Sequence, residues 1–255
     1  MTDVTVTTST AIVTVVTPQS ATVTTSGVAT ATINQNQATV VSNLQQVDTI
    51  GDPTWIQFNT TGTATPGVGR LNWNETDGTF EFQMKGGNVT QQIGMEQVLL
   101  CKSSTNGGLI EGKVVYPTGS DGSNLLVAYA LGNTETTSTR TLAVMTESST
   151  GGAKGYATTF GLVRGLNTDH LVEGQAVWVS PTVAGDTTAT KPTAPNHAVL
   201  VGFCLRKSVN NGVLFVSISN GWELEELHNV KITNPTDGQV LKYQASTGLW
   251  INGSI

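Results

Sequence analysis

The stretch "HAVLVGFCLRKSVNNGVLFVSISNG", His197–Gly221, holds two runs rich in β-branched and aromatic residues. Such residues favour β-strands, and both runs are shorter than most helices. In the second run Leu214, Val216 and Ile218 are two apart, so they share one face of a pleated strand. The stretch therefore predicts strands that contribute to a compact β core.

Two further runs of this type precede it, "TTFGLVRG" and "GQAVWVSP", and a Thr/Pro-rich loop follows the second. Ala176 and Trp178 alternate in the same way, and we assign them to the same core. Four strands between residues 156 and 221 predict a small barrel or sandwich. Gly-rich turn signals recur from about Gly51 onward, and only Trp222–Val230 has helix-like spacing. We therefore expect an all-β chain of modular, short-stranded sandwich or barrel domains.

The composition excludes several classes of protein. Charged residues make up 12% of the 255 residues and the net charge is −6, whereas nucleic-acid binding needs clustered Lys and Arg. So few ionisable groups also disfavour an enzyme, and we expect no cofactor. The sequence shows no signal peptide and no apolar run long enough for a membrane span. Cys101 and Cys204 lie in separate apolar runs, which favours buried reduced thiols over a disulfide.

The stretch "LNWNETDGTFEFQMKGG", Leu71–Gly87, predicts a β-hairpin with Asp77-Gly78 at its turn. Trp73, Phe80 and Phe82 would lie on one face, with the polar residues on the other. A lone hairpin is marginally stable in water, so this aromatic face must be covered. Its cover is either a neighbouring protomer or the rest of the same chain, and the Gly pair would let the chain leave the sheet.

The first 51 residues differ from the remainder. They contain no Lys or Arg, and Thr and Val dominate the first thirty. We expect an extended arm of short strands that docks on another chain and anchors the protein to a particle. An ordinary small β-sandwich is the alternative. The candidate docking residues are Val4, Val6, Val13 and Val15.

Catalytic and metal-binding patterns are weak. The three histidines, His170, His197 and His228, have no second His or Cys at ligand spacing, so we expect no metal site. The nearby acids Glu223, Glu225 and Glu226 are expected to form a solvated face rather than a glycosidase pair. We therefore predict no catalytic residues.

Several stretches together resemble the modular β-proteins that tailed bacteriophages use as tail fibres and head appendages. These are "LNWNETDGTFEFQMKGGNVTQQIGMEQ", "GKVVYPTGSDG" and the segment that continues through "HAVLVGFCLR" to "NGWELEELHNV". The final stretch, "DGQVLKYQASTGLWING", is similar to the short phage-fibre repeat of an Asp-Gly turn, a strand, a Thr-Gly turn and a Trp. The resemblance runs roughly from Trp55 to Asn252.

The resemblance implies a homotrimer, its protomers intertwined, with one end fixed to the particle. It leads us to expect a virion structural protein, made in the host bacterial cytoplasm, that is a fibre or a capsid or tail appendage. The partners would be its own copies and phage capsid, collar or tail proteins. The alternative function is a host-receptor module that binds surface glycan. We divide the chain into an anchoring arm (1–51), a β-hairpin module (52–97), a central β-domain (98–221) and a short helix with a fibre-type β motif (222–255).

Overall fold

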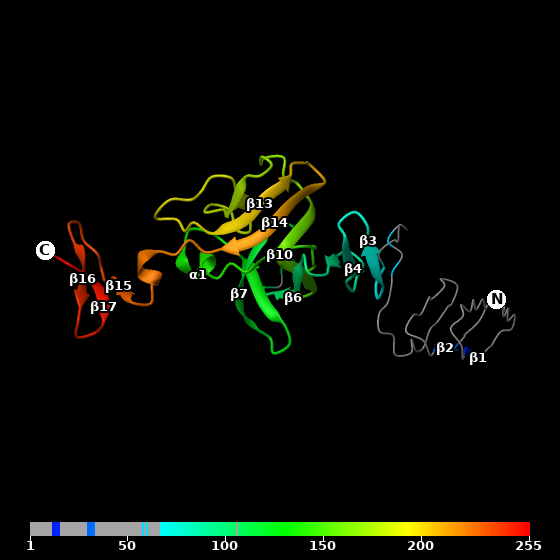
Figure 1. The fold of residues 1–255 in the computed structure, drawn as a ribbon. Coiled ribbons are helices and arrows are strands. Elements are labelled where there is room, and N and C mark those ends of the chain that lie inside the picture. Colours follow the sequence, from blue (N-terminus) through cyan, green and yellow to red (C-terminus); the bar gives the residue numbers. More distant parts are fainter. Residues whose placement is uncertain (1–11, 16–29, 34–57, 59, 61–66, 106) are drawn as a thin grey trace. The chain divides into compact units, whose positions relative to one another are not determined.

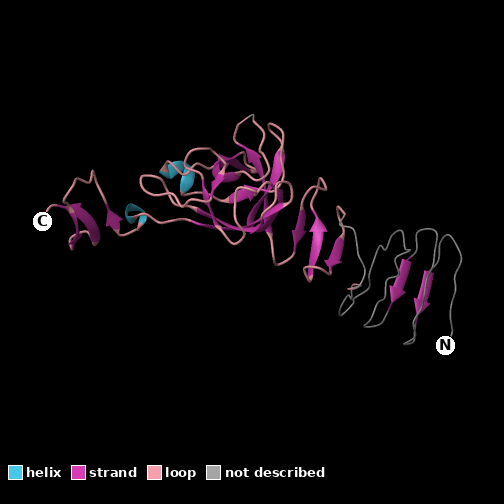
Figure 2. Cartoon of the chain, turned by 90° about the horizontal axis from the view of Figure 1, so that it is seen from above, coloured by secondary structure: helices cyan, strands magenta, loops and turns pink. Residues whose placement is uncertain are grey.

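The structure is a computed structural model that describes residues 12–15, 30–33, 58, 60, 67–105 and 107–255 (Figure 1). Of these described residues, 44% lie in strands and 4% in helices, which confirms the all-β expectation (Figure 2). The chain divides into two compact units. The first comprises residues 1–64 and 72–78, and the second comprises residues 65–71 and 79–255.

In the first unit, β1 (Ile12–Val15) and β2 (Thr30–Ile33) pair in parallel. The same unit contains the turn that follows β3 (Leu71–Asn74). There the side-chain oxygen of Asn74 accepts a hydrogen bond from the backbone N–H of Asp77 at 3.0 Å, and Gly78 has a φ of 66°. This is the local geometry predicted for the Asp-Gly turn.

The second unit contains β4 (Thr79–Gln83) and β5 (Thr90–Gln92), which are antiparallel. Gly86 and Gly87 have φ values of 103° and 81° and lie in the turn between these two strands. We expected the Gly pair to let the chain leave the sheet, and this was wrong. Its positive φ values instead reverse the chain, so that β5 returns alongside β4.

The central sheet of the second unit has nine strands in the order β12-β11-β13-β14-β10-β6-β8-β7-β9. Its strands are β6 (Gln97–Ser103), β7 (Val114–Ser120), β8 (Leu125–Tyr129), β9 (Ala143–Met145), β10 (Lys154–Leu166), β11 (Ala176–Val179), β12 (Thr187–Thr188), β13 (Leu200–Arg206) and β14 (Gly212–Ser219). The short helix α1 (Glu135–Ser138) precedes β9. Because β9 pairs with both β7 and β10, the strands β10, β6, β8, β7 and β9 close into a ring. The central part is thus a small barrel from which β14, β13, β11 and β12 extend.

Irregularities in β10 allow this strand to serve both the barrel and its extension. The register of its pairing with β6 shifts between Thr158 and Phe160. The register of its pairing with β14 shifts between Arg164 and Leu166. Gly161 has a φ of 109°, and a Cβ there would lie 2.6 Å from the backbone oxygen of Met95. Bulges of this kind bend a strand and increase its twist.

Two groups of buried side chains form the core of this unit. One fills the barrel: Cys101, Leu109, Val115, Val127, Ala143, Met145 and Ala157. The other lies under the extension: Val114, Ala130, Val144, Val163, Leu166, Leu171, Val177, Val179, Val199, Val201, Cys204, Leu214 and Val216. Neighbours such as Val114 and Val115 fall in different groups because successive side chains point to opposite faces. Cys101 and Cys204 are buried free thiols, as predicted.

The four runs predicted between residues 156 and 221 are the strands β10, β11, β13 and β14. Leu214 and Val216 are buried as expected, but the predicted face of β11 was wrong. Val177 and Val179 enter the core, while Trp178 lies on the other face with the Lys191 ammonium 5.4 Å from its ring centroid. A partly solvated Trp ring can form a cation–π contact with a lysine, whereas the compact Val side chain packs well in the core of a β-sheet.

The last part of the chain begins with the 3-10 helix η1 (Leu224–Glu226), within the stretch where helix-like spacing was noted. A three-stranded sheet follows, in the order β15 (Val230–Lys231), β17 (Leu249–Gly253) and β16 (Val240–Gln244). Gly238 and Gly248 have φ values of 80° and 71°, as tight Asp-Gly and Thr-Gly turns require. None of the residues from 222 to 255 is buried.

Candidate functional site

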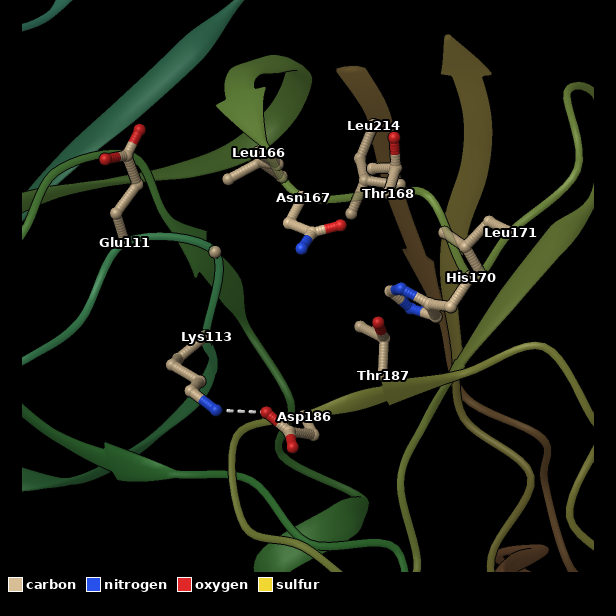
Figure 3. Close-up of a pocket in the computed structure, with 11 residues that line it drawn as sticks. Glu111, Lys113, Leu166, Asn167, Thr168, His170, Leu171, Asp186, Thr187 and Leu214 are labelled. Atoms are coloured by element: carbon tan, nitrogen blue, oxygen red, sulfur yellow. Dashed lines mark hydrogen bonds and ion pairs between the residues drawn. The ribbon is translucent and has the colours of Figure 1, made fainter. Parts of the chain in front are cut away.

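A pocket of about 440 Å3 opens where β10 ends. Its lining comes from the turn before β7, the loop after β10, the start of β12 and one residue of β14 (Figure 3). The lining residues are Glu111, Gly112, Lys113, Leu166, Asn167, Thr168, His170, Leu171, Asp186, Thr187 and Leu214. These residues are distant in the sequence, so only the barrel and its extension bring them together.

Hydrogen bonds hold the segments around the pocket in place. The Thr168 hydroxyl donates to the backbone oxygen of Arg206 at 2.7 Å, and the Thr168 N–H donates to that of Ser208 at 2.8 Å. On the opposite side, the N–H of Gly112 donates to the oxygen of Met145 at 2.8 Å. The pocket is therefore formed by anchored backbone rather than by free loops.

The floor and rim of the pocket differ in polarity. Leu166, Leu171 and Leu214 are buried and belong to the core, so the floor is apolar. Figure 3 shows the amide of Asn167 and the ring of His170 beside the cavity, both on the loop after β10. An apolar floor with a few convergent polar groups is the usual construction of a small-ligand site.

Charged groups lie along one side of this pocket. Lys113 forms an ion pair with Asp186. Burial, and then repulsion by Glu147, raise the pKa of Glu111 above its ordinary value of 4.5. The pocket is thus lined by two acidic side chains, Glu111 and Asp186, and by one basic side chain, Lys113.

A second polar cluster surrounds His197, which lies in the loop before β13. Its Nδ1 is 2.9 Å from Oε1 of Glu223 and 3.4 Å from Oε2 of Glu135, the first residue of α1. The N–H of Glu223 in turn donates to the side chain of Glu226 at 2.5 Å. Burial, followed by repulsion from Glu226, raises the pKa of Glu135.

The expectation of a merely solvated acidic face holds for Glu225, which is exposed, but was wrong for Glu223 and Glu226. Both are half-buried, and they contribute to a capping box at η1. No spacing rule could have associated them with His197 or Glu135, because these residues come from separate segments of the chain. The cluster fastens the segment after β14 to the central sheet, which is a structural task.

The docking residues predicted from the sequence remain predictions. Val4 and Val6 lie outside the described residues, and Val13 and Val15 are in β1. Trp73, Phe80 and Phe82 are half-buried, whereas the buried positions of these strands are Asn72, Thr79 and Glu81.

The C-terminal sheet exposes a group of apolar side chains that the sequence analysis did not single out. Tyr243 stands opposite Trp250 in the pairing of β16 with β17, and their ring centroids are 5.6 Å apart. Leu241 shares their face because it is two residues from Tyr243. All three are exposed.

In the part of the chain that the structure describes, no group of three or more His, Cys, Asp or Glu side chains could hold a metal ion. Nor does any helix in that part have the length and apolarity needed to cross a membrane. Comparisons with protein-family models, with curated proteins and with solved structures find no match for this chain.

Proposed function

We propose that this chain is a structural component of a tailed-phage virion, a homotrimeric fibre or a capsid or tail appendage that is attached through its N-terminal arm. The observation that carries the proposal is the C-terminal sheet. It is a regular three-stranded sheet, yet none of the residues from 222 to 255 is buried. A small sheet in water needs its apolar face covered to be stable.

Further copies of the same chain are the simplest cover for this sheet. Most soluble oligomers are built from identical chains with closed symmetry, and three copies related by an axis would cover their sheets mutually. The face that contains Leu241, Tyr243 and Trp250 offers two aromatic rings for such contact. The stretch from Asp237-Gly238 to Trp250 resembles the short phage-fibre repeat, and this resemblance supports the same trimeric arrangement.

Two other features support a structural role. The central sheet closes into a ring of strands and packs two groups of buried side chains, which suits a rigid spacer. The charged fraction of 12% also leaves a surface dominated by hydroxyl and amide groups. Attachment through the arm follows from its lack of basic residues and its Thr/Val pattern.

The experiment that tests the proposal is light scattering on the purified full chain at micromolar concentration. We expect a particle of three times 26.7 kDa. The variant Leu241→Asp should dissociate it, because a carboxylate would be buried without a partner at the interface.

The matched control is Val209→Asp, at an exposed position in the loop between β13 and β14, and it should remain trimeric. A stable monomer of the unmodified chain would refute the trimer. Equal masses for the wild type and the Leu241→Asp variant would show that the C-terminal sheet is not the contact.

A further inference from the structure

Acidic side chains, rather than apolar ones, attach the segment that follows β14 to the central part of the chain. Within residues 222–229, only Glu223 and Glu226 are half-buried. The large apolar side chains of this segment are all exposed: Trp222, Leu224 and Leu227. Because little apolar surface is removed from water here, polar contacts must hold the segment in place.

These polar contacts converge on one imidazole. Nδ1 of His197, whose side chain is 12% exposed, lies 2.9 Å from Oε1 of Glu223 and 3.4 Å from Oε2 of Glu135. The side chain of Glu226 accepts from the N–H of Glu223 at 2.5 Å and repels Glu135. Three carboxyl groups and one imidazole thus meet from α1, the loop before β13 and the start of η1. These four residues form the His197 cluster.

The imidazole is the only cationic group that the described residues bring to this cluster. No Lys or Arg among them lies within ion-pair distance of the three carboxyl groups. The other ionisable side chains on the same elements form no ion pair with the cluster: Arg140, Lys191, Glu225 and His228. Protons therefore decide how much of the negative charge is compensated.

The repulsion within the cluster grows as the pH rises. An imidazolium compensates one of the three carboxylates, whereas a neutral imidazole compensates none, and histidine is the residue type that changes charge near neutral pH. Burial, and then repulsion by Glu226, raise the pKa of Glu135. The attached state therefore holds this proton more tightly than a detached state does, and the stabilisation is lost as the pH rises.

No further polar contact lies beyond the cluster. Among the described residues, none from 228 to 255 forms a hydrogen bond or ion pair with a residue before Leu227. The His197 cluster is therefore the last polar attachment before the C-terminal sheet. Losing it would free the segment that leads to this sheet without disturbing β14.

We propose that the His197 cluster is a pH-sensitive clasp, which holds residues 222–229 on the central part of the chain in mildly acidic solution and releases them above neutral pH. This inference goes beyond the proposed structural role. It rests on contacts within one protomer, so it stands whether the chain is trimeric or not.

The test is amide hydrogen exchange of the full chain, measured by mass spectrometry at about pH 5.5 and about pH 8, on either side of the histidine range. Each rate is divided by the intrinsic exchange rate at the same pH. The amides of Glu226 and Leu227 donate across η1. Their protection should fall about fivefold at the higher pH, the ratio that about 1 kcal/mol gives. Protection in β14 should stay unchanged.

Three variants assign the effect to the cluster. Glu226→Gln keeps an acceptor for the N–H of Glu223 but removes a carboxylate, so it should preserve protection at the higher pH. His197→Gln removes the cation, so the fall in protection should become smaller. The matched control is Glu225→Gln, at an exposed carboxylate of the same 3-10 helix, which should show the wild-type fall.

Four results would overturn the proposal. They are equal or higher wild-type protection at the higher pH, an undiminished fall in His197→Gln, equal responses of Glu225→Gln and Glu226→Gln, or a parallel loss of protection in β14. The last result would mean general unfolding rather than release of the segment. If Glu226→Gln fails to fold, the wild type and His197→Gln still decide.

Discussion

The Nδ1 atom of His197 lies 2.9 Å from Oε1 of Glu223, so the loop before β13 contacts the segment that leaves β14. Asn220 reinforces this junction, because its side-chain amide donates to the backbone oxygen of Thr139 at 2.8 Å. A Cβ on Gly221 would lie 2.3 Å from the oxygen of Ala198, so the two backbones are in close contact. The segment that leads to the C-terminal sheet is therefore fixed at its start.

The first prediction concerns Glu135, whose carboxylate lies near His197 and Glu226, while the Thr139 hydroxyl donates to its backbone oxygen. Its pKa is raised above 4.5, so the folded chain binds this proton more tightly than the unfolded chain does. Protonated Glu135 therefore contributes stability that is fully present below pH 4.5, the ordinary pKa. This contribution is lost as the pH rises through the pKa of the folded chain. Glu135→Gln, which stays neutral, should raise the melting temperature at pH 7 slightly and leave it unchanged at about pH 4.

Thermal unfolding followed by circular dichroism at several pH values measures this difference. A lower melting temperature for Glu135→Gln at neutral pH would mean that attraction between Glu135 and His197 outweighs the burial and the repulsion. His197→Gln in the same background would then distinguish the two contributions.

The second prediction concerns Glu96, whose side chain is 1% exposed and receives Nη1 of Arg164 at 2.5 Å. Its other oxygen accepts from the N–H of Gln92 at 3.0 Å. Glu96→Ala removes the carboxylate that accepts from the Arg164 guanidinium and from the backbone N–H of Gln92. Since Arg164 is 39% exposed and partly solvated, we expect a loss of about 2–3 kcal/mol in the free energy of unfolding.

Chemical denaturation gives this quantity. The comparison is Lys102→Ala, which removes an ion pair with Asp121 nearer the surface and should cost less than about 1 kcal/mol. Similar losses for the two variants would show that Glu96 is not the anchor between the β4–β5 segment and β10.

The third prediction compares two methionines. Met145 is fully buried in the barrel, whereas Met95 is 42% exposed. Truncating a buried Met to Ala removes packing and leaves a cavity, so Met145→Ala should cost about 2–5 kcal/mol. Met95→Ala should change stability by less than about 0.5 kcal/mol. Equal denaturation midpoints for the two variants would contradict the placement of Met145 in the barrel core.

The fourth prediction concerns the arm. Deleting residues 2–50 should leave a folded trimer that no longer incorporates into phage particles, because the deletion removes the proposed docking segment. Added salt should weaken attachment of the full chain only slightly, since residues 1–51 hold two acidic and no basic residues.

Size-exclusion chromatography with light scattering, and a particle-incorporation assay, measure the two halves of this prediction. A truncated chain that fails to fold would make residues 1–51 part of the protomer core. An N-terminal β-domain would then replace the docking arm.

The sequence determined the class of fold and much of its local structure. Runs of β-branched residues predicted β10, β13 and β14, and Asp77-Gly78 predicted a turn that the positive φ of Gly78 confirms. These features depend on neighbouring residues only, because strand preference and the freedom of Gly are local properties. The buried thiols of Cys101 and Cys204 were predictable for the same reason, from apolar neighbours.

Only the tertiary structure decided which faces are buried and which distant residues meet. Alternation shows that Trp178 and Val177 point in opposite directions, but both are apolar, so packing had to select the Val face for the core. The Glu96–Arg164 pair, the His197 cluster and the pocket at the end of β10 each combine residues far apart in the chain. Their proximity follows from the closure of the sheet through β9 and from the bends in β10, which depend on long-range pairing that no local pattern encodes.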